Sequence, residues 1–146
     1  MMLQSIATQI AFLLLRDTFA GSQGYSEMNI MNDDDYVTKA IVYMNKYYSC
    51  SITIDDICRA IYLSPSYFTR MFKNKTSMTP YRFLLELRLE KAKELLSESN
   101  FSIEEVSRLC GFANPAHLST AFKESKGVPP SEYRKQFQFN KENQRS

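Results

Sequence analysis

The sequence predicts an all-α protein in which two helix-turn-helix subdomains are joined by a long linker helix. Glycine and proline are scarce, at 4 and 5 of 146 residues, so few residues are present that would bound short strands. Apolar residues recur instead at the three- and four-residue spacing of helices. The chain also contains an internal repeat: the segment SPSYFTRMFK at 64–73 is similar to NPAHLSTAFK at 114–123. Two copies are too few for a solenoid, so we expect two similar helical units.

Residues 1–20 predict one apolar helix, and residues 21–32 predict a linker. The apolar run is shorter than the ~20 residues that span a membrane, and no Lys or Arg precedes it as in a secretory signal. No membrane association is therefore expected. Glycines, serines and asparagines without an apolar period follow, which is typical of a linker.

The two expected subdomains, at about 33–78 and 102–137, carry the same helix-start signals. The first helix of each pair follows the spacing of a capping box, in which an acid bonds back to the helix start. These boxes are Thr53 with Asp56 and Ser102 with Glu105. The second helix of each pair follows a capping side chain and a proline, which favours the first helical position. These starts are Ser64-Pro65 and Asn114-Pro115.

A long linker helix is expected at about 80–98, between the two subdomains. It opens with a proline and carries leucines on more than one side, so we expect it to touch both subdomains and to fix their separation. Pro129-Pro130 opens a shorter final helix. The residues after it, 138–146, are expected to form a polar tail.

The second helix of each pair has a buried side and an exposed side. Large apolar residues four positions apart share one helical face, so Phe68 and Phe72, like Leu118 and Phe122, must face the core. The opposite sides are mostly polar or basic. They present Ser66, Thr69, Arg70 and Lys73 in the first subdomain and Ala116, His117, Thr120 and Lys123 in the second.

Composition argues against an enzyme or a metalloprotein. The net charge of +2 is a weak signal for any partner. Three cysteines without C-x-x-C spacing predict neither disulfides nor a zinc site; we expect them to be buried small apolar residues in the reducing cytoplasm. His117 has no partner at ligand spacing, and no phosphate loop or paired-carboxylate pocket is recognisable. No cofactor, metal or catalytic residue is therefore expected.

Three stretches of the sequence carry a more specific pattern. They are ITIDDICRAIYLSPSYFTRMFK, RLEKAKELL and SIEEVSRLCGFANPAHLSTAFKESKGVPPSEYRKQF. In the last stretch a Gly-Phe pair, a polar turn, Phe-Lys, Gly, Pro and Tyr-Arg follow one another in register. With these stretches, residues 33–137 resemble the DNA-binding domain of the AraC/XylS family of bacterial transcription regulators.

The resemblance implies a sequence-specific DNA-binding transcription regulator, most often an activator. Its partners would be double-stranded DNA and RNA polymerase. A rigid link would let both recognition helices enter adjacent major-groove segments on one face of the DNA, one helical turn (~34 Å) apart. The implied base contacts are Ser66, Thr69 and Arg70 in the first subdomain and Ala116, His117 and Thr120 in the second. Lys73 and Lys123 are either phosphate contacts or ordinary surface charges.

Family members usually carry an effector-binding or dimerisation domain ahead of this one. On that expectation residues 1–20 are the end of such a domain, the chain is a fragment or truncated product, and the full-length form is a homodimer. Some DNA-alkylation repair enzymes join a similar domain to a cysteine-rich zinc module, but that cysteine cluster is absent from the sequence. The alternative to DNA binding is a helical protein-interaction module, because helix-turn-helix folds serve other functions too.

The first subdomain departs from the family pattern at two positions. Tyr62 stands where glycine is common in the turn, and a left-handed conformation there would cost roughly 1–2 kcal/mol. We therefore expect this turn to be shaped differently from the one at Gly111, which is also one residue longer. Ser77 stands where the second subdomain has Gly127, which predicts a less regular exit from the helix.

Overall fold

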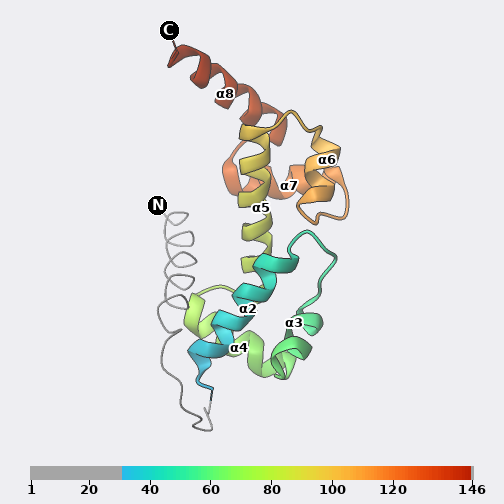
Figure 1. Cartoon of the computed structure of the whole chain (residues 1–146), viewed down its shortest axis with the longest axis vertical. Helices are drawn as coiled ribbons and strands as arrows, with labels where there is room; N and C mark the ends of the chain where they lie inside the picture. Colours follow the sequence, from blue (N-terminus) through green and yellow to red (C-terminus); the bar gives the residue numbers. More distant parts are fainter. Residues whose placement is uncertain (1–30, 146) are drawn as a thin grey trace, which may run out of the picture. The chain divides into compact units, whose positions relative to one another are not determined.

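The computed structural model describes residues 31–145, and every element in this part of the chain is an α-helix (Figure 1). In chain order the helices are α2 (Asp33–Tyr47), α3 (Ile54–Ile61), α4 (Pro65–Thr76), α5 (Pro80–Glu98), α6 (Ile103–Leu109), α7 (Pro115–Lys126) and α8 (Pro130–Asn143). The all-α prediction is confirmed. The apolar helix expected at 1–20 and most of the linker expected at 21–32 lie outside the described residues. No described helix is both long enough and apolar enough to cross a membrane.

The described residues form two compact units. The first holds α2 up to Lys46, then α3 and α4 up to Thr79. The second holds α5 to α8, together with the segment 47–53 that connects α2 to α3. The long helix α5 therefore belongs to the second unit. That it also sets the separation of the two units stays a prediction.

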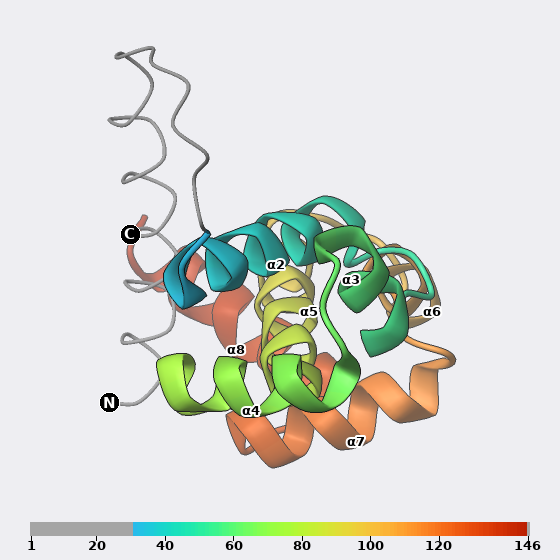
Figure 2. The ribbon, with the colours of Figure 1, turned by 90° about the horizontal axis from the view of Figure 1, so that it is seen from below.

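The core of the first unit is built from one face of each of its three helices. In Figure 2, α3 lies at the end of the unit where α2 finishes and α4 begins. Phe68 and Phe72 of α4 are fully buried, and their ring centres lie 5.4 Å apart. The other buried apolar residues of these helices are Val37, Ala40, Ile41, Met44, Ile57, Cys58, Ile61 and Met71. The predicted core side of α4 is confirmed.

The core of the second unit gathers α5, α6 and α7, with α8 packed against it. Its buried members are Leu89, Ala92, Leu96, Val106, Cys110, Phe112, Leu118, Ala121 and Phe122. Tyr133 of α8 meets the ring of Phe122 edge-on at 5.4 Å. The helix α8 continues to Asn143, so most of the polar tail expected at 138–146 is helical, and its described residues are exposed. Its last turns are helical although they offer no apolar face to the core.

The connecting segment 47–53 is held against α5 by one arginine. Arg88 Nε donates to the carbonyl of Tyr48, and its Nη2 donates to the carbonyl of Cys50, both at 2.9 Å. Partial burial lowers the pKa of the Arg88 guanidinium. Cys58 and Cys110 are buried as expected, but Cys50 is exposed. The expectation of burial is therefore wrong for Cys50, because this residue lies in the connecting segment and not on a packed helical face.

The turns of the two units share one backbone feature despite their different residues. Tyr62 has a φ of 61° and Gly111 a φ of 80°, so the expectation of a differently shaped first turn is wrong at this position. Ser77 and Gly127 both end their helices in the left-handed region, and their N–H groups donate to the carbonyls four residues earlier at 2.8 and 2.9 Å. The exit of α4 is thus as regular as that of α7.

Candidate nucleic-acid interface

The helix α4 presents a polar face that begins at its capped N-terminus. The N–H of Tyr67 donates to Ser64 Oγ at 3.4 Å, and Pro65 takes the first helical position. Burial of Phe68 and Phe72 turns the opposite side outward. On that side Ser66, Arg70 and Lys73 are exposed, and Thr69 is half-buried. The structure thus brings the four residues predicted in the first unit onto one helix face.

The guanidinium of Arg70 is available for a ligand. Among residues 31–145 it makes neither an ion pair nor a hydrogen bond. The centre of the Tyr67 ring lies 6.0 Å from the Arg70 guanidinium carbon. Arginine offers donors in a fixed fork, and that fork matches the O6 and N7 acceptors that guanine shows in the major groove.

The helix α7 repeats this arrangement with weaker hydrogen-bonding groups. Asn114 Oδ1 accepts from the N–H of His117 at 2.8 Å, and Pro115 again opens the helix. Ala116, Thr120 and Lys123 are exposed, and none of them offers the bidentate donor set of an arginine. The imidazole of His117 is half-buried and meets Phe112 edge-on, with ring centres 5.3 Å apart.

The caps give the register between the two helices. Tyr67 donates its N–H to the cap of α4, and His117 does the same in α7, so these two residues are counterparts. The counterpart of Thr69 is then Ser119, which is half-buried and absent from the residues predicted above. Counting from the two capping residues in the sequence would have found it.

The basic residues of α4 and α7 fall into two groups. Lys75 pairs with Asp34 at 3.1 Å, and the buried Lys126 pairs with Glu90, so both have a structural role. Lys73 and Lys123 are exposed, and within the described chain their side chains form no ion pair or hydrogen bond. These two lysines are free to meet a phosphate.

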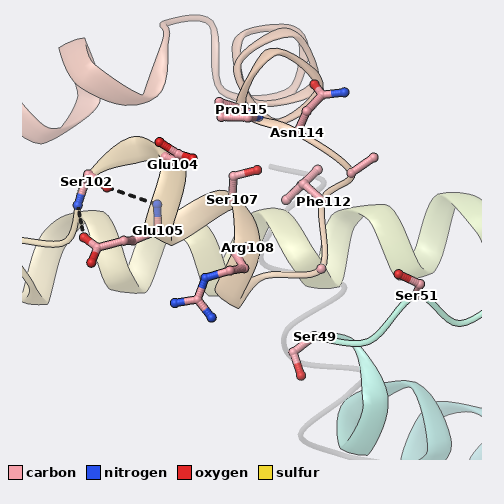
Figure 3. Close-up of a pocket in the computed structure, with 12 residues that line it drawn as sticks. Ser49, Ser51, Ser102, Glu104, Glu105, Ser107, Arg108, Phe112, Asn114 and Pro115 are labelled. Carbon is pink, nitrogen blue, oxygen red and sulfur yellow. Dashed lines mark hydrogen bonds between the residues drawn. The ribbon is translucent and has the colours of Figure 1, made fainter.

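A polar hollow of about 750 Å³ lies beside the start of α7 in the second unit (Figure 3). It is lined by Ser49, Ser51, Ser102, Glu104, Glu105, Ser107, Arg108, Gly111, Phe112, Ala113, Asn114 and Pro115. At its edge, Ser102 and Glu105 form a reciprocal capping box, drawn as dashed lines. Hydrogen bonds from Ser102 lower the pKa of the Glu105 carboxyl. Within residues 31–145, no group of three or more His, Cys, Asp or Glu side chains is placed so that it could hold a metal ion.

Comparison with known sequences connects this geometry to a family. The model of a family described as a helix-turn-helix domain matches residues 57–136, more than half of the chain. The raffinose operon transcriptional regulatory protein RafR of Pediococcus pentosaceus is 40% identical over 96 residues, which make up 66% of this chain and 35% of RafR. The Msm operon regulatory protein of Streptococcus mutans is 31% identical over 105 residues, 72% of this chain and 38% of that protein. The chain thus spans little more than a third of these curated relatives.

Solved structures give the same result. The C-terminal domain of AraT, a response regulator from Geobacillus stearothermophilus, matches with a TM-score of 0.68 and 31% identity over 76% of this chain and 88% of that one. The DNA-binding domain of AdpA, solved with a target DNA, matches with a TM-score of 0.69 and 25% identity over 71% and 94% of the two chains. An AraC-type regulator from Chromobacterium violaceum matches with a TM-score of 0.66 and 29% identity over 70% and 91%. The chain therefore belongs to the AraC-type helix-turn-helix family, whose members are DNA-binding domains of transcription regulators and not enzymes.

Proposed function

We propose that this chain recognises specific sequences in double-stranded DNA by placing α4 and α7 in the major groove. The observation that carries the proposal is the Arg70 guanidinium on the exposed face of α4, which makes no ion pair or hydrogen bond with any described residue. A helix-turn-helix presents the first half of its second helix to base edges. On that face Arg70 reads a guanine, and Ser66 and Thr69 contact neighbouring edges.

The second helix reads DNA with less direct hydrogen bonding. Ala116 and Thr120 suit the methyl group of thymine, and His117 contributes a polar edge. Because no arginine lies on this face of α7, sequence-dependent DNA shape contributes more to its selectivity. Lys73 and Lys123 bind phosphates and hold each helix in register. The two helices occupy adjacent major-groove segments, one helical turn (~34 Å) apart.

The relatives support a role in activating transcription. RafR and the Msm protein are named as operon regulators, and the lactose operon transcription activator of Staphylococcus xylosus is 27% identical over 114 residues. We extend the proposal to RNA polymerase as a second partner. A dimerisation or effector domain ahead of residue 33 would make the complete regulator a homodimer that acts in the cytoplasm.

The first test is binding to duplex DNA recovered by selection from a random pool. Affinity should fall steeply with added salt, because phosphate contacts release counterions. Replacing Arg70 with Ala should cost ~1–3 kcal/mol and relax the preference at one base position. Arg59→Ala is the matched control: it removes the same charge from the first unit, at an exposed side chain that pairs with Asp56 at 3.8 Å.

Two results would contradict parts of this proposal. Binding that is absent at low salt, or that does not change with salt, would remove DNA recognition altogether. Loss of affinity in Arg70→Ala that is equal for every base at every position would make Arg70 a phosphate contact. An Arg59→Ala chain that relaxes the same base position would show that net charge, and not the Arg70 contact, sets the preference.

A further inference from the structure

Tyr67 lies on α4 next to the proposed base contacts but was not predicted to be one of them. Its hydroxyl donates to Asp33 Oδ1 of α2 at 3.0 Å. Its side chain is 40% exposed, so the core of the first unit does not require its ring. The hydrogen bond to Asp33 raises the pKa of the Tyr67 phenol above its ordinary value. A tyrosine is protonated at neutral pH even without such a shift, so the hydroxyl can donate there.

Arg70 follows Tyr67 by three positions, so the two side chains leave the same side of the helix. The guanidinium carbon lies 6.0 Å from the centre of the Tyr67 ring, at the outer limit of a cation–π contact. No other described residue holds the Arg70 guanidinium by an ion pair or a hydrogen bond. The tyrosine ring is therefore the feature that can restrict where this guanidinium points.

The acceptor of the tyrosine hydroxyl is itself firmly placed. Asp33 is the first residue of α2, and two reciprocal hydrogen bonds cap the start of this helix. The N–H of Asn32 donates to Asp35 Oδ2 at 3.1 Å, and the N–H of Asp35 donates to Asn32 Oδ1 at 2.9 Å. The adjacent Asp34 pairs with Lys75 of α4 at 3.1 Å. The first turn of α2 thus contacts α4 at two points, one near each end of the helix.

We propose that Tyr67 is a positioning residue for Arg70, with Asp33 holding the phenol so that its ring supports the guanidinium in the direction of the base. The inference rests on the proposed base contact of Arg70. An arginine whose rotamers are restricted before binding loses less side-chain entropy when it meets guanine. The gain applies to the base that Arg70 reads and not to DNA in general.

The second unit lacks this arrangement. His117 takes the place of Tyr67, but its ring packs on Phe112 of its own unit. Thr120 takes the place of Arg70, so no positively charged side chain lies three positions after His117. The support is therefore specific to the helix that carries an arginine.

The test measures base preference at the position that Arg70→Ala relaxes, by competition between duplexes that differ at that one base pair. Tyr67→Ala removes both the aromatic ring and the hydrogen bond to Asp33. We expect the base preference to fall about two- to fivefold, the range of an exposed cation–π contact. Tyr67→Phe and Asp33→Ala both keep the ring and lose the hydrogen bond, so both should lower the base preference by less. Melting temperatures of all variants report whether the fold is kept.

Asp34→Ala is the matched control for Asp33→Ala, because both remove one negative charge from the same turn. Both should raise affinity for all duplexes equally by reducing repulsion of phosphates, but only Asp33→Ala should also lower the base preference. In an Arg70→Ala background, Tyr67→Ala should change the preference no further.

Several outcomes would overturn the proposal. One is an unchanged preference in Tyr67→Ala or in Asp33→Ala. Another is a loss in Tyr67→Ala that is equal for all duplexes and persists when Arg70 is already alanine, as for an independent phosphate contact. If Arg70→Ala itself leaves every base preference unchanged, the base contact fails and the inference fails with it. A relaxed preference in Arg70→Ala beside an unaffected Tyr67→Ala would overturn the inference alone.

Discussion

Among residues 31–145, four residues adopt a left-handed backbone, and at one of these four a side chain would have no room. Tyr62 and Ser77 accept the conformation with side chains in place, at φ of 61° and 62°. Gly127 has open space where a Cβ would lie. At Gly111 an added Cβ would lie 2.1 Å from the carbonyl oxygen of Tyr48, far inside van der Waals contact. Glycine is therefore required at this position for packing as well as for conformation.

Replacing Gly111 with Ala should destabilise the protein by more than about 3 kcal/mol, the upper range for a single substitution. Gly127→Ala is the control, because it has the same conformational strain, roughly 1–2 kcal/mol, without the steric clash. Denaturant unfolding of both variants gives the comparison. Equal losses would mean that the segment carrying Tyr48 moves aside at little cost.

Cys110 makes stability depend on pH in the alkaline range. Burial raises the pKa of its thiol from 9.0 to about 11, so the folded state disfavours the thiolate. The resulting stabilisation is fully present below pH 9 and is lost as pH rises from 9 to 11, by up to about 2–3 kcal/mol. Cys110→Ala should leave a cavity and lower stability at pH 7, but its stability should fall less between pH 9 and 11.

The measurement for Cys110 is the free energy of unfolding of both chains at pH 8 and pH 11, under reducing conditions. Tyrosines and lysines titrate in the same range, so the difference between the two chains isolates the thiol. A Cys110→Ala profile parallel to that of the wild type would contradict the assignment.

At the scale of the helix, start signals in the sequence were better predictors than end signals. The predicted helix starts at Ser64, Ser102 and Asn114 are confirmed. Each depends on a local hydrogen bond, in which the capping side chain accepts from the backbone N–H three residues later. The end of α8 at Asn143 was missed because no apolar period accompanies its last turns. The left-handed conformation of Tyr62 was not predictable from the sequence, since the packing of α3 and α4 outweighs a local cost of roughly 1–2 kcal/mol.

The candidate interface was predictable where it follows from helical spacing. Burial of Phe68 and Phe72 determines which side of α4 faces outward, so the position of Arg70 on the exposed side could be predicted from the sequence. The hydrogen bond from the Tyr67 hydroxyl to Asp33 could not be predicted from the sequence. It joins residues 34 positions apart, and nothing local to α4 indicates it.

The capping box of α6 gives a prediction at this scale. Replacing Ser102 with Ala removes the bond that Ser102 Oγ accepts from the N–H of Glu105 at 3.1 Å, and such a loss costs about 1 kcal/mol. The melting temperature should fall accordingly. Ser131→Ala is the control, since this exposed serine lies in the first turn of α8 without being its cap, and it should leave the melting temperature almost unchanged.

At the scale of the whole molecule, the two units repeat one backbone plan with different side chains on the exposed faces of α4 and α7. The cap, the proline start, the buried pair and the left-handed exit occur in both units. Arg70 and Tyr67 in one unit correspond to Thr120 and His117 in the other. A duplicated fold therefore does not predict a duplicated DNA sequence.

This asymmetry predicts the form of the binding site. Selection from a random duplex pool should recover a site with two parts one helical turn (~34 Å) apart, of which one is strongly constrained at a guanine and the other weakly constrained. Arg70→Ala should relax the strong part and leave the weak part as it was. Thr120→Arg should add a constrained base to the weak part, because it supplies the bidentate donor that α7 lacks. Two equally constrained parts in the wild-type selection, or a Thr120→Arg selection identical to it, would show that the base contacts do not follow the register of α4 and α7.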